Sequence, residues 1–125
     1  MARVTAASGP TPESFLPLTA VVFEILLALS GADLHGYEIM REVESRSAGR
    51  VSLHAGSLYR ALHRLLRARL VDEVIERPAA ELDDERRRYY RLTALGRGVA
   101  VAEARRLASQ VDAARDRRLL KGSPS

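Results

Sequence analysis

The chain has 125 residues, which is enough for one domain with a single modest hydrophobic core. It contains no cysteine, which excludes a disulfide framework and thiolate chemistry and favours a reducing, cytoplasmic location. No apolar run is long enough to span a membrane, and the first ten residues lack the apolar core of a signal peptide. We therefore expect no membrane association.

The net charge of +4 is unevenly distributed along the chain. Residues 50–71 carry five arginines and no carboxylate, whereas residues 72–85 carry seven carboxylates and a single arginine. Residues 86–125 are again strongly basic. This segregation favours a functional basic face over a uniformly charged surface.

Residues 1–13 are small, polar and without periodicity, and we expect them to form a flexible lead. A first helix is predicted to begin near Pro17 and to end at Gly31, because proline suits a first helical turn and glycine suits a helix end. Its apolar residues recur at the spacing of a largely buried helix: Leu18, Val21, Val22, Ile25, Leu26 and Leu29.

Residues 33–38 predict a turn into a second helix that fades near Gly49. His35 precedes Glu38 by three residues, which is a weak version of a capping box because histidine is a poor cap. A structural role is favoured for His35 over a metal-binding role, since no partner residue lies at metal-ligand spacing.

The third predicted helix begins near His54, and its leucines recur at helical spacing to form a buried face. The opposite face is basic, and Ala55, Gly56 and Ser57 make the first turn slim. Two short helices joined by a turn, the second one basic, predict a helix-turn-helix whose second helix lies in the major groove of DNA. The alternative is an ordinary amphipathic helix with a solvated basic face. That face consists of Gly56, Arg60, His63, Arg64 and Arg67.

Residues 70–76 and 86–93 are rich in β-branched, aromatic or alternating residues, and a polar loop with Pro78 lies between them. This pattern predicts a two-stranded hairpin that must pack on the helices to be stable. The predicted fold is therefore mainly α with a small β-hairpin, a winged helix-turn-helix covering residues 14–93.

Thr93 is a good N-cap for a long last helix, predicted over residues 94–120 and followed by a frayed tail at 121–125. Its terminal basic residues suit the negative end of the helix dipole, which we prefer to a second nucleic-acid site. Small residues at alternating spacings of three and four predict a close dimerisation seam formed by Ala100, Ala104, Leu107, Val111 and Ala114.

Three motifs resemble the PadR family of bacterial transcriptional regulators. They are Leu-His-Gly-Tyr-Glu-Ile at residues 34–39, Ser-Leu-Tyr-Arg-Ala-Leu-His-Arg-Leu at 57–65, and Arg-Tyr-Tyr-Arg-Leu-Thr-Ala-Leu-Gly at 88–96. They occur in the family's order, and the last helix is similar to the single C-terminal dimerisation helix of its shorter members. The resemblance implies a homodimer that binds a near-palindromic double-stranded DNA operator, usually as a repressor that a small-molecule effector releases.

The resemblance also implies roles for single residues. Tyr59 matches a tyrosine that contacts backbone phosphate, and Ser57, Arg60 and Arg64 fall where side chains of the recognition helix meet bases or phosphates. Tyr37 would lie at the start of the second helix, near the DNA backbone. With the flanking histidines and the basic start of the second wing strand, the predicted DNA-binding residues are Tyr37, His54, Gly56, Ser57, Tyr59, Arg60, His63, Arg64, Arg67, Arg86, Arg87 and Arg88.

The chain departs from the family's pattern in two places. Ala68-Arg69 replaces an acidic residue followed by glycine, so the third helix must end without the usual left-handed glycine. The wing tip at residues 81–85 is acidic, and we expect it to point away from DNA or to pair with the arginine run.

The resemblance also implies that Tyr90 and Leu92 are wing residues packed on the core.

The sequence leaves one other class of function open and disfavours another. An interaction module, in which the basic face binds an acidic protein partner without specific DNA readout, remains the alternative. An enzyme is disfavoured, because the sequence has no glycine-rich phosphate loop, no histidine with a partner at useful spacing and no metal constellation. No cofactor and no metal are expected.

Overall fold

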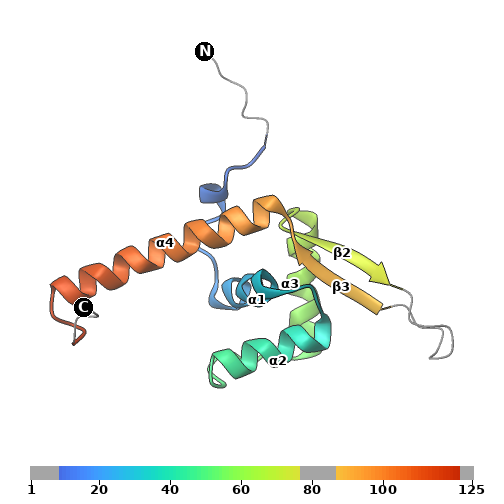
Figure 1. The fold of residues 1–125 in the computed structure, drawn as a ribbon, viewed down its shortest axis with the longest axis horizontal. Helices are drawn as coiled ribbons and strands as arrows, with labels where there is room; N and C mark the ends of the chain where they lie inside the picture. The colour runs from blue at the N-terminus through green and yellow to red at the C-terminus, as the bar shows by residue number, and fades with distance from the viewer. Residues whose placement is uncertain (1–8, 77–86, 122–125) are drawn as a thin grey trace, which may run out of the picture.

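The computed structural model describes residues 9–76 and 87–121, and within them it is mainly helical with a small sheet (Figure 1). This confirms the fold class expected from the sequence. The elements in chain order are η1 (Pro12–Phe15), α1 (Ala20–Gly31), β1 (Leu34–His35), α2 (Gly36–Arg46), α3 (Ala55–Arg67), β2 (Val71–Glu76), β3 (Arg87–Leu92) and α4 (Ala94–Asp116).

The sheet has the strand order β1-β3-β2, with both neighbouring pairs antiparallel. β2 and β3 form the predicted hairpin, paired from Val71 opposite Leu92 to Glu76 opposite Arg87. The third strand, β1, differs from the sequence-based expectation, which gives a turn at residues 33–38. It places Leu34 opposite Tyr90 and His35 opposite Tyr89 on the free edge of β3.

One hydrophobic core joins all four α-helices to the hairpin. Nine of the ten largest fully buried side chains among the described residues belong to it, including Ile25 and Leu26 of α1, Ile39 of α2, and Leu58 and Leu62 of α3. Leu70 and Val71 close the core at the start of the hairpin, and Val99 closes it from α4. The core therefore holds α2 and α3 in a fixed relation to the sheet and to the last helix.

The first α-helix begins at Ala20, three residues later than expected from Pro17. Thr19 is its N-cap, and the Thr19 hydroxyl oxygen accepts a 3.2 Å hydrogen bond from the backbone N–H of Val22. The predicted lead of residues 1–13 lies mostly outside the described residues. Its last two, Pro12 and Glu13, begin the 3-10 helix η1, which packs on α4.

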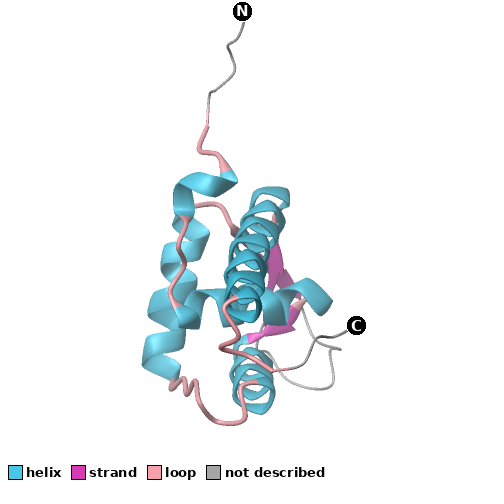
Figure 2. Cartoon of the chain, turned by 90° about the vertical axis from the view of Figure 1, so that its left-hand side faces the viewer, coloured by secondary structure: helices cyan, strands magenta, loops and turns pink. Residues whose placement is uncertain are grey.

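The last helix, α4, starts at the sheet and runs well past the body of the domain (Figure 1). Its buried residues are Gly96, Val99, Ala100 and Glu103, all in its first half. The sheet lies at the opposite end of the molecule from the free end of α4, and Figure 2 shows it at the far side of the helices. Half of a long helix thus lacks a partner within the described chain.

None of the helices described is both long enough and apolar enough to cross a membrane.

Candidate nucleic-acid interface

Helix α3 divides into the two faces that its sequence predicts. Leu58, Ala61, Leu62 and Leu65 are buried, whereas the residues of the opposite face are exposed to solvent. Those exposed residues are Gly56, Arg60, His63, Arg64 and Arg67. The leucines fix the helix on the core, so the three arginines project from a rigid support.

The start of α3 is closed by His54. Its Nδ1 accepts a 3.3 Å hydrogen bond from the backbone N–H of Ser57, and the Ser57 hydroxyl donates in return to the backbone oxygen of His54 at 3.1 Å. A Cβ atom placed on Gly56 would lie 3.4 Å from the His54 ring and 3.6 Å from the Arg60 guanidinium. The His54 imidazole and the Arg60 guanidinium therefore lie next to the backbone of Gly56. Because Gly56 has no side chain, the N-terminal turn of α3 stays narrow.

Tyr59 lies on the side of α3 that faces the start of α2, and its side chain is about half exposed. Its ring end lies over Gly36, where an added Cβ atom would overlap the Tyr59 hydroxyl oxygen and approach Cζ to 2.9 Å. Gly36 was not singled out from the sequence, although a glycine at a first helical position is a signal for such close packing. Its missing side chain lets Tyr59 sit at the junction of the two helices.

The first turn of α2 is closed by a full capping box. His35 Nδ1 accepts from the backbone N–H of Glu38 at 3.3 Å, and the Glu38 carboxylate accepts from the backbone N–H of His35 at 3.0 Å. The His35 ring also lies 5.6 Å from the Tyr89 ring of β3. The capping box that the sequence predicts only in a weak form is therefore complete, and His35 has a structural role at the start of α2.

Tyr37 follows the capping box and is exposed, with 61% of its surface open to solvent. The guanidinium carbon of Arg41 lies 5.6 Å from the centre of its ring, a cation–π contact along the outer face of α2. The sequence predicts Tyr37 at the start of this helix, and the structure places it there as an exposed residue.

The wing is anchored by buried residues of β3. Tyr90 and Leu92 lie in the core, as the resemblance implied. Burial raises the pKa of the Tyr90 hydroxyl, and the nearby Glu73 carboxylate raises it further, so this tyrosine stays neutral. Arg88 is exposed, and its guanidinium lies 3.5 Å from Glu73. Arg86, the acidic tip at 81–85 and the side chain of Arg87 lie outside what the structure describes.

The predicted dimerisation residues fall into two groups. Ala100 is buried in the core of its own chain. The other four, beyond it on α4, are exposed or half-buried: Ala104, Leu107, Val111 and Ala114. On α1, the half-buried Phe23 and Leu27 are spaced four residues apart and do not belong to the cluster of apolar residues packed on the core. α1 and α4 therefore both present apolar side chains that the described chain leaves partly open.

Among the described residues, no group of three or more histidine, aspartate or glutamate side chains could hold a metal ion.

Comparison with known proteins identifies the relatives of this chain. The sequence model of the transcriptional regulator PadR-like family matches residues 25–102. No curated protein matches significantly.

Solved structures with similar folds were also found. A PadR family transcription regulator from Clostridium difficile R20291 superposes with a TM-score of 0.65 at 22% identity, covering 78% of this chain and 97% of that one. A PadR-like transcriptional regulator from Bacillus cereus gives a TM-score of 0.60 at 21% identity, covering 82% and 93%. The complex structure of hsRosR-S1, from H. salinarum, gives 0.61 at 31% identity, covering 81% and 82%.

Proposed function

The chain belongs to the PadR-like family of transcriptional regulators, and from that premise we propose that it acts as a homodimeric, sequence-specific repressor whose operator is near-palindromic and whose release depends on a small-molecule effector. The single observation that carries the proposal is the basic outer face of α3, held on the core by its leucine face. A rigid helix with a slim start and projecting arginines suits the major groove of DNA.

In this proposal Arg60 and Arg64 read base edges, because they lie on successive turns of the exposed face and arginine pairs bidentately with guanine. His63 and Arg67 flank them and contact phosphates or bases. His54 Nδ1 is occupied by the capping bond to Ser57, so the imidazole approaches DNA through Nε2.

Backbone phosphates are held by groups on both sides of α3. Tyr59 and Tyr37 present exposed rings next to the start of α2, and the exposed Arg88 brings a cation from the second wing strand. Phosphate contacts fix the register of a protein on the duplex but carry no sequence information. Loss of Arg88 should therefore weaken binding equally for all sequences.

The dimer is proposed to form through the apolar residues that the single chain leaves open. Leu107, Val111 and Ala114 follow one face of the protruding half of α4, and Phe23 and Leu27 lie on α1, which packs on α4. A second copy related by a two-fold axis would bury these side chains. The same axis would relate two recognition helices, which is why a near-palindromic operator is expected.

The test is a fluorescence-anisotropy titration against a duplex from upstream of the chain's own gene, with a scrambled duplex of equal length at two salt concentrations. The upstream duplex should bind at least about a thousandfold tighter at physiological salt. Arg60→Ala or Arg64→Ala should cost about 1–3 kcal/mol on that duplex and relax its specificity. Arg88→Ala should weaken binding to both duplexes alike and lower the salt slope by about one.

Arg117→Ala, which removes an exposed arginine at the end of α4, is the matched control and should leave DNA binding unchanged. If both duplexes bind equally and both dissociate as the salt concentration rises, the base-readout assignment is wrong. The basic face would then be a docking surface for an acidic protein partner, which is the competing function.

A further inference from the structure

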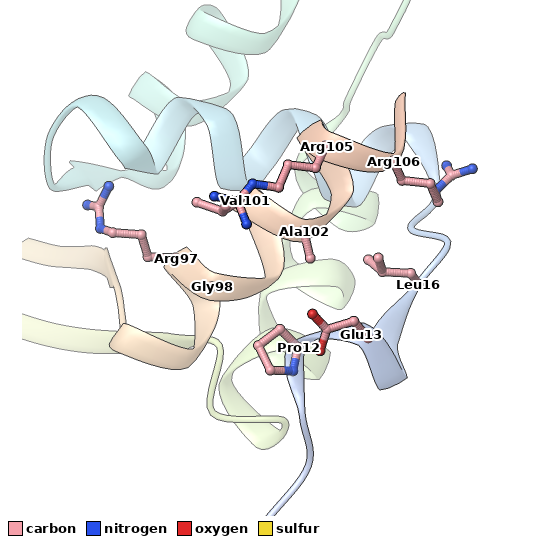
Figure 3. Close-up of a pocket in the computed structure, with 9 residues that line it drawn as sticks. All are labelled: Pro12, Glu13, Leu16, Arg97, Gly98, Val101, Ala102, Arg105 and Arg106. Carbon is pink, nitrogen blue, oxygen red and sulfur yellow. The ribbon is translucent and has the colours of Figure 1, made fainter. Parts of the chain in front are cut away.

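The structure contains a groove between η1 and the first half of α4, on a part of the surface with no assigned role (Figure 3). Pro12, Glu13 and Leu16 form one wall, and residues of α4 from Arg97 to Arg106 form the other. Its volume is about 610 Å³, within the range of small-molecule sites. With a rise of 1.5 Å per residue, the α4 wall is roughly 13 Å long, so the groove is elongated.

The middle of the groove is apolar. Pro12 and Leu16 lie across from Ala102, and Val101 lines the edge beside Arg97 and Arg105 (Figure 3). Gly98 adds bare backbone next to Pro12, since a Cβ atom there would lie 3.2 Å from Pro12 Cγ. Most of the lining surface is carbon. An occupant therefore needs a slender hydrocarbon body rather than a polar one.

The charges at the groove favour an anion. Arg106 is already neutralised, because its guanidinium donates to the buried Glu103 carboxylate at 2.6 and 2.9 Å. Arg97 and Arg105 make no ion pair within the described residues, and they extend from the same side of the groove with Val101 between them (Figure 3). Only one carboxylate, that of Glu13, opposes these two cations at the lining.

The wall that carries these arginines is firmly fixed. The Glu103 carboxylate, 2% exposed, also accepts a 3.2 Å hydrogen bond from the backbone N–H of Leu18, which ties the segment after η1 to α4. A groove held open in this way needs little rearrangement to accept a ligand, which reduces the cost of binding.

We propose that the groove between η1 and α4 binds an amphipathic monoanion, a medium-length aliphatic chain ending in a carboxylate. The chain lies along Leu16, Val101 and Ala102, and the carboxylate is bound by Arg105 or Arg97. This inference deepens the proposed function, because it supplies the effector site and the ligand class left open there. Ligand binding does not require DNA, so it is measured on the free protein.

The experiment compares octanoate, octanamide and octylammonium, which share one chain length and carry an anionic, a neutral and a cationic head group. Each is titrated into the ¹⁵N-labelled full chain without DNA, and amide shifts are followed by NMR. Octanoate should shift residues 12–16 and 97–106 and bind about tenfold more tightly than octanamide, as expected for one charge-assisted hydrogen bond. Octylammonium should bind most weakly.

Variants locate the site. Arg105→Gln or Arg97→Gln should weaken octanoate about tenfold without changing octanamide, whereas Arg117→Gln, which removes the same charge outside the groove, should change neither. Glu13→Gln should strengthen octanoate binding. Ala102→Leu should block all three compounds by filling the groove, and its amide spectrum verifies that the variant is folded.

Three results would overturn the inference. Octanoate and octanamide could bind with equal affinity, or neither Arg97→Gln nor Arg105→Gln could weaken octanoate binding. Amide shifts confined to residues outside 12–16 and 97–106 would also overturn it. Loss of self-association in Ala102→Leu, with no octanoate binding by the parent chain, would show instead that a second copy covers the groove. Failure of the chain to bind its upstream duplex would refute the proposed repressor but leave the octanoate titration interpretable.

Discussion

Arg69 adopts a backbone conformation that arginine rarely takes, with φ at 65°. It follows Ala68, the C-cap residue of α3. The helix ends in a Schellman motif, in which the backbone N–H of Leu70 donates to the backbone oxygen of Leu65 at 3.0 Å. The backbone N–H of Arg69 donates to the backbone oxygen of Leu66 at 3.1 Å. The sequence predicts that α3 ends without a left-handed glycine, and it does. The left-handed conformation itself is retained, because Arg69 adopts it in place of glycine.

Arg69→Gly should raise the free energy of unfolding by about 1 kcal/mol, because glycine reaches the left-handed region without steric cost. The bonds of the motif involve only the backbone and are retained. Urea unfolding followed by circular dichroism measures the change. Arg67→Gly is the matched control: it removes the same charge inside the helix and should lower the free energy of unfolding by about 1 kcal/mol. Destabilisation by both substitutions would contradict the assignment of strain to Arg69.

Glu103 makes a second prediction at this scale. Hydrogen bonds from Arg106 hold the pKa of the buried Glu103 carboxyl below its ordinary value. A carboxyl whose pKa is lowered in the folded chain adds stability above its unfolded pKa, and that stability is lost as the pH falls through the folded pKa. Glu103→Gln should therefore melt at a lower temperature than the parent at pH 7, and the difference should narrow as the pH falls below about 4.3.

Calorimetric melting at several pH values tests this. Glu44→Gln is the control, since Glu44 is exposed on α2 and makes no ion pair among the described residues. A difference between Glu103→Gln and the parent that stays constant from pH 7 to pH 3 would show that the carboxylate charge contributes nothing.

At the scale of elements, the joint between α3 and α4 depends on two residues. The Thr93 hydroxyl donates to the Arg69 oxygen at 2.7 Å and accepts from the Gly96 N–H at 2.9 Å, so one side chain caps α4 and holds the end of α3. A Cβ atom on Gly96 would overlap the Leu70 carbonyl oxygen and lie 2.9 Å from its carbon. The two elements can meet this closely only because Gly96 has no side chain.

Gly96→Ala should destabilise the chain by about 2–3 kcal/mol, because backbone rather than a flexible side chain blocks the new methyl group. Gly31→Ala, at the last residue of α1, is the control. Nothing lies within 4 Å of its added Cβ atom, so it should be neutral or stabilising by up to about 1 kcal/mol. Chemical denaturation of both variants decides the matter, and equal stability of the two would contradict the close packing.

The sequence was most informative where an element is long and amphipathic. The leucine spacing predicted which face of α3 is buried, and Thr93 predicted the start of α4, because these signals are local. β1 escaped prediction because two residues are too few for an alternating pattern, and their pairing with β3 depends on residues more than 50 positions away. The sequence also does not predict the contact between Tyr59 and Gly36, because this contact depends on how α2 and α3 pack against each other.

For the molecule as a whole, the proposed dimer predicts that a charge on the protruding half of α4 separates the subunits. Val111→Glu would place a carboxylate in the apolar seam, and burial of an unpaired charge is costly. Sedimentation velocity should show a monomer, and circular dichroism should show an unchanged helix content. The affinity for a duplex that carries both operator half-sites should fall at least about a hundredfold. Ser109→Glu adds the same charge to the other side of the helix and should remain a dimer. A dimer in both variants would exclude this seam.

In the proposed dimer, the joint at Thr93 and Gly96 would make α4 the element that sets the spacing of the operator half-sites. Because the root of α4 is fixed to the end of α3, the distance and angle between the two recognition helices of a dimer depend on the residues between that root and the seam. One residue inserted there would turn the partner by about 100° and move it by about 1.5 Å. In the proposed dimer, α3 would carry base preference and α4 would carry half-site spacing. The two properties can then diverge independently, and two chains with identical α3 sequences need not share an operator.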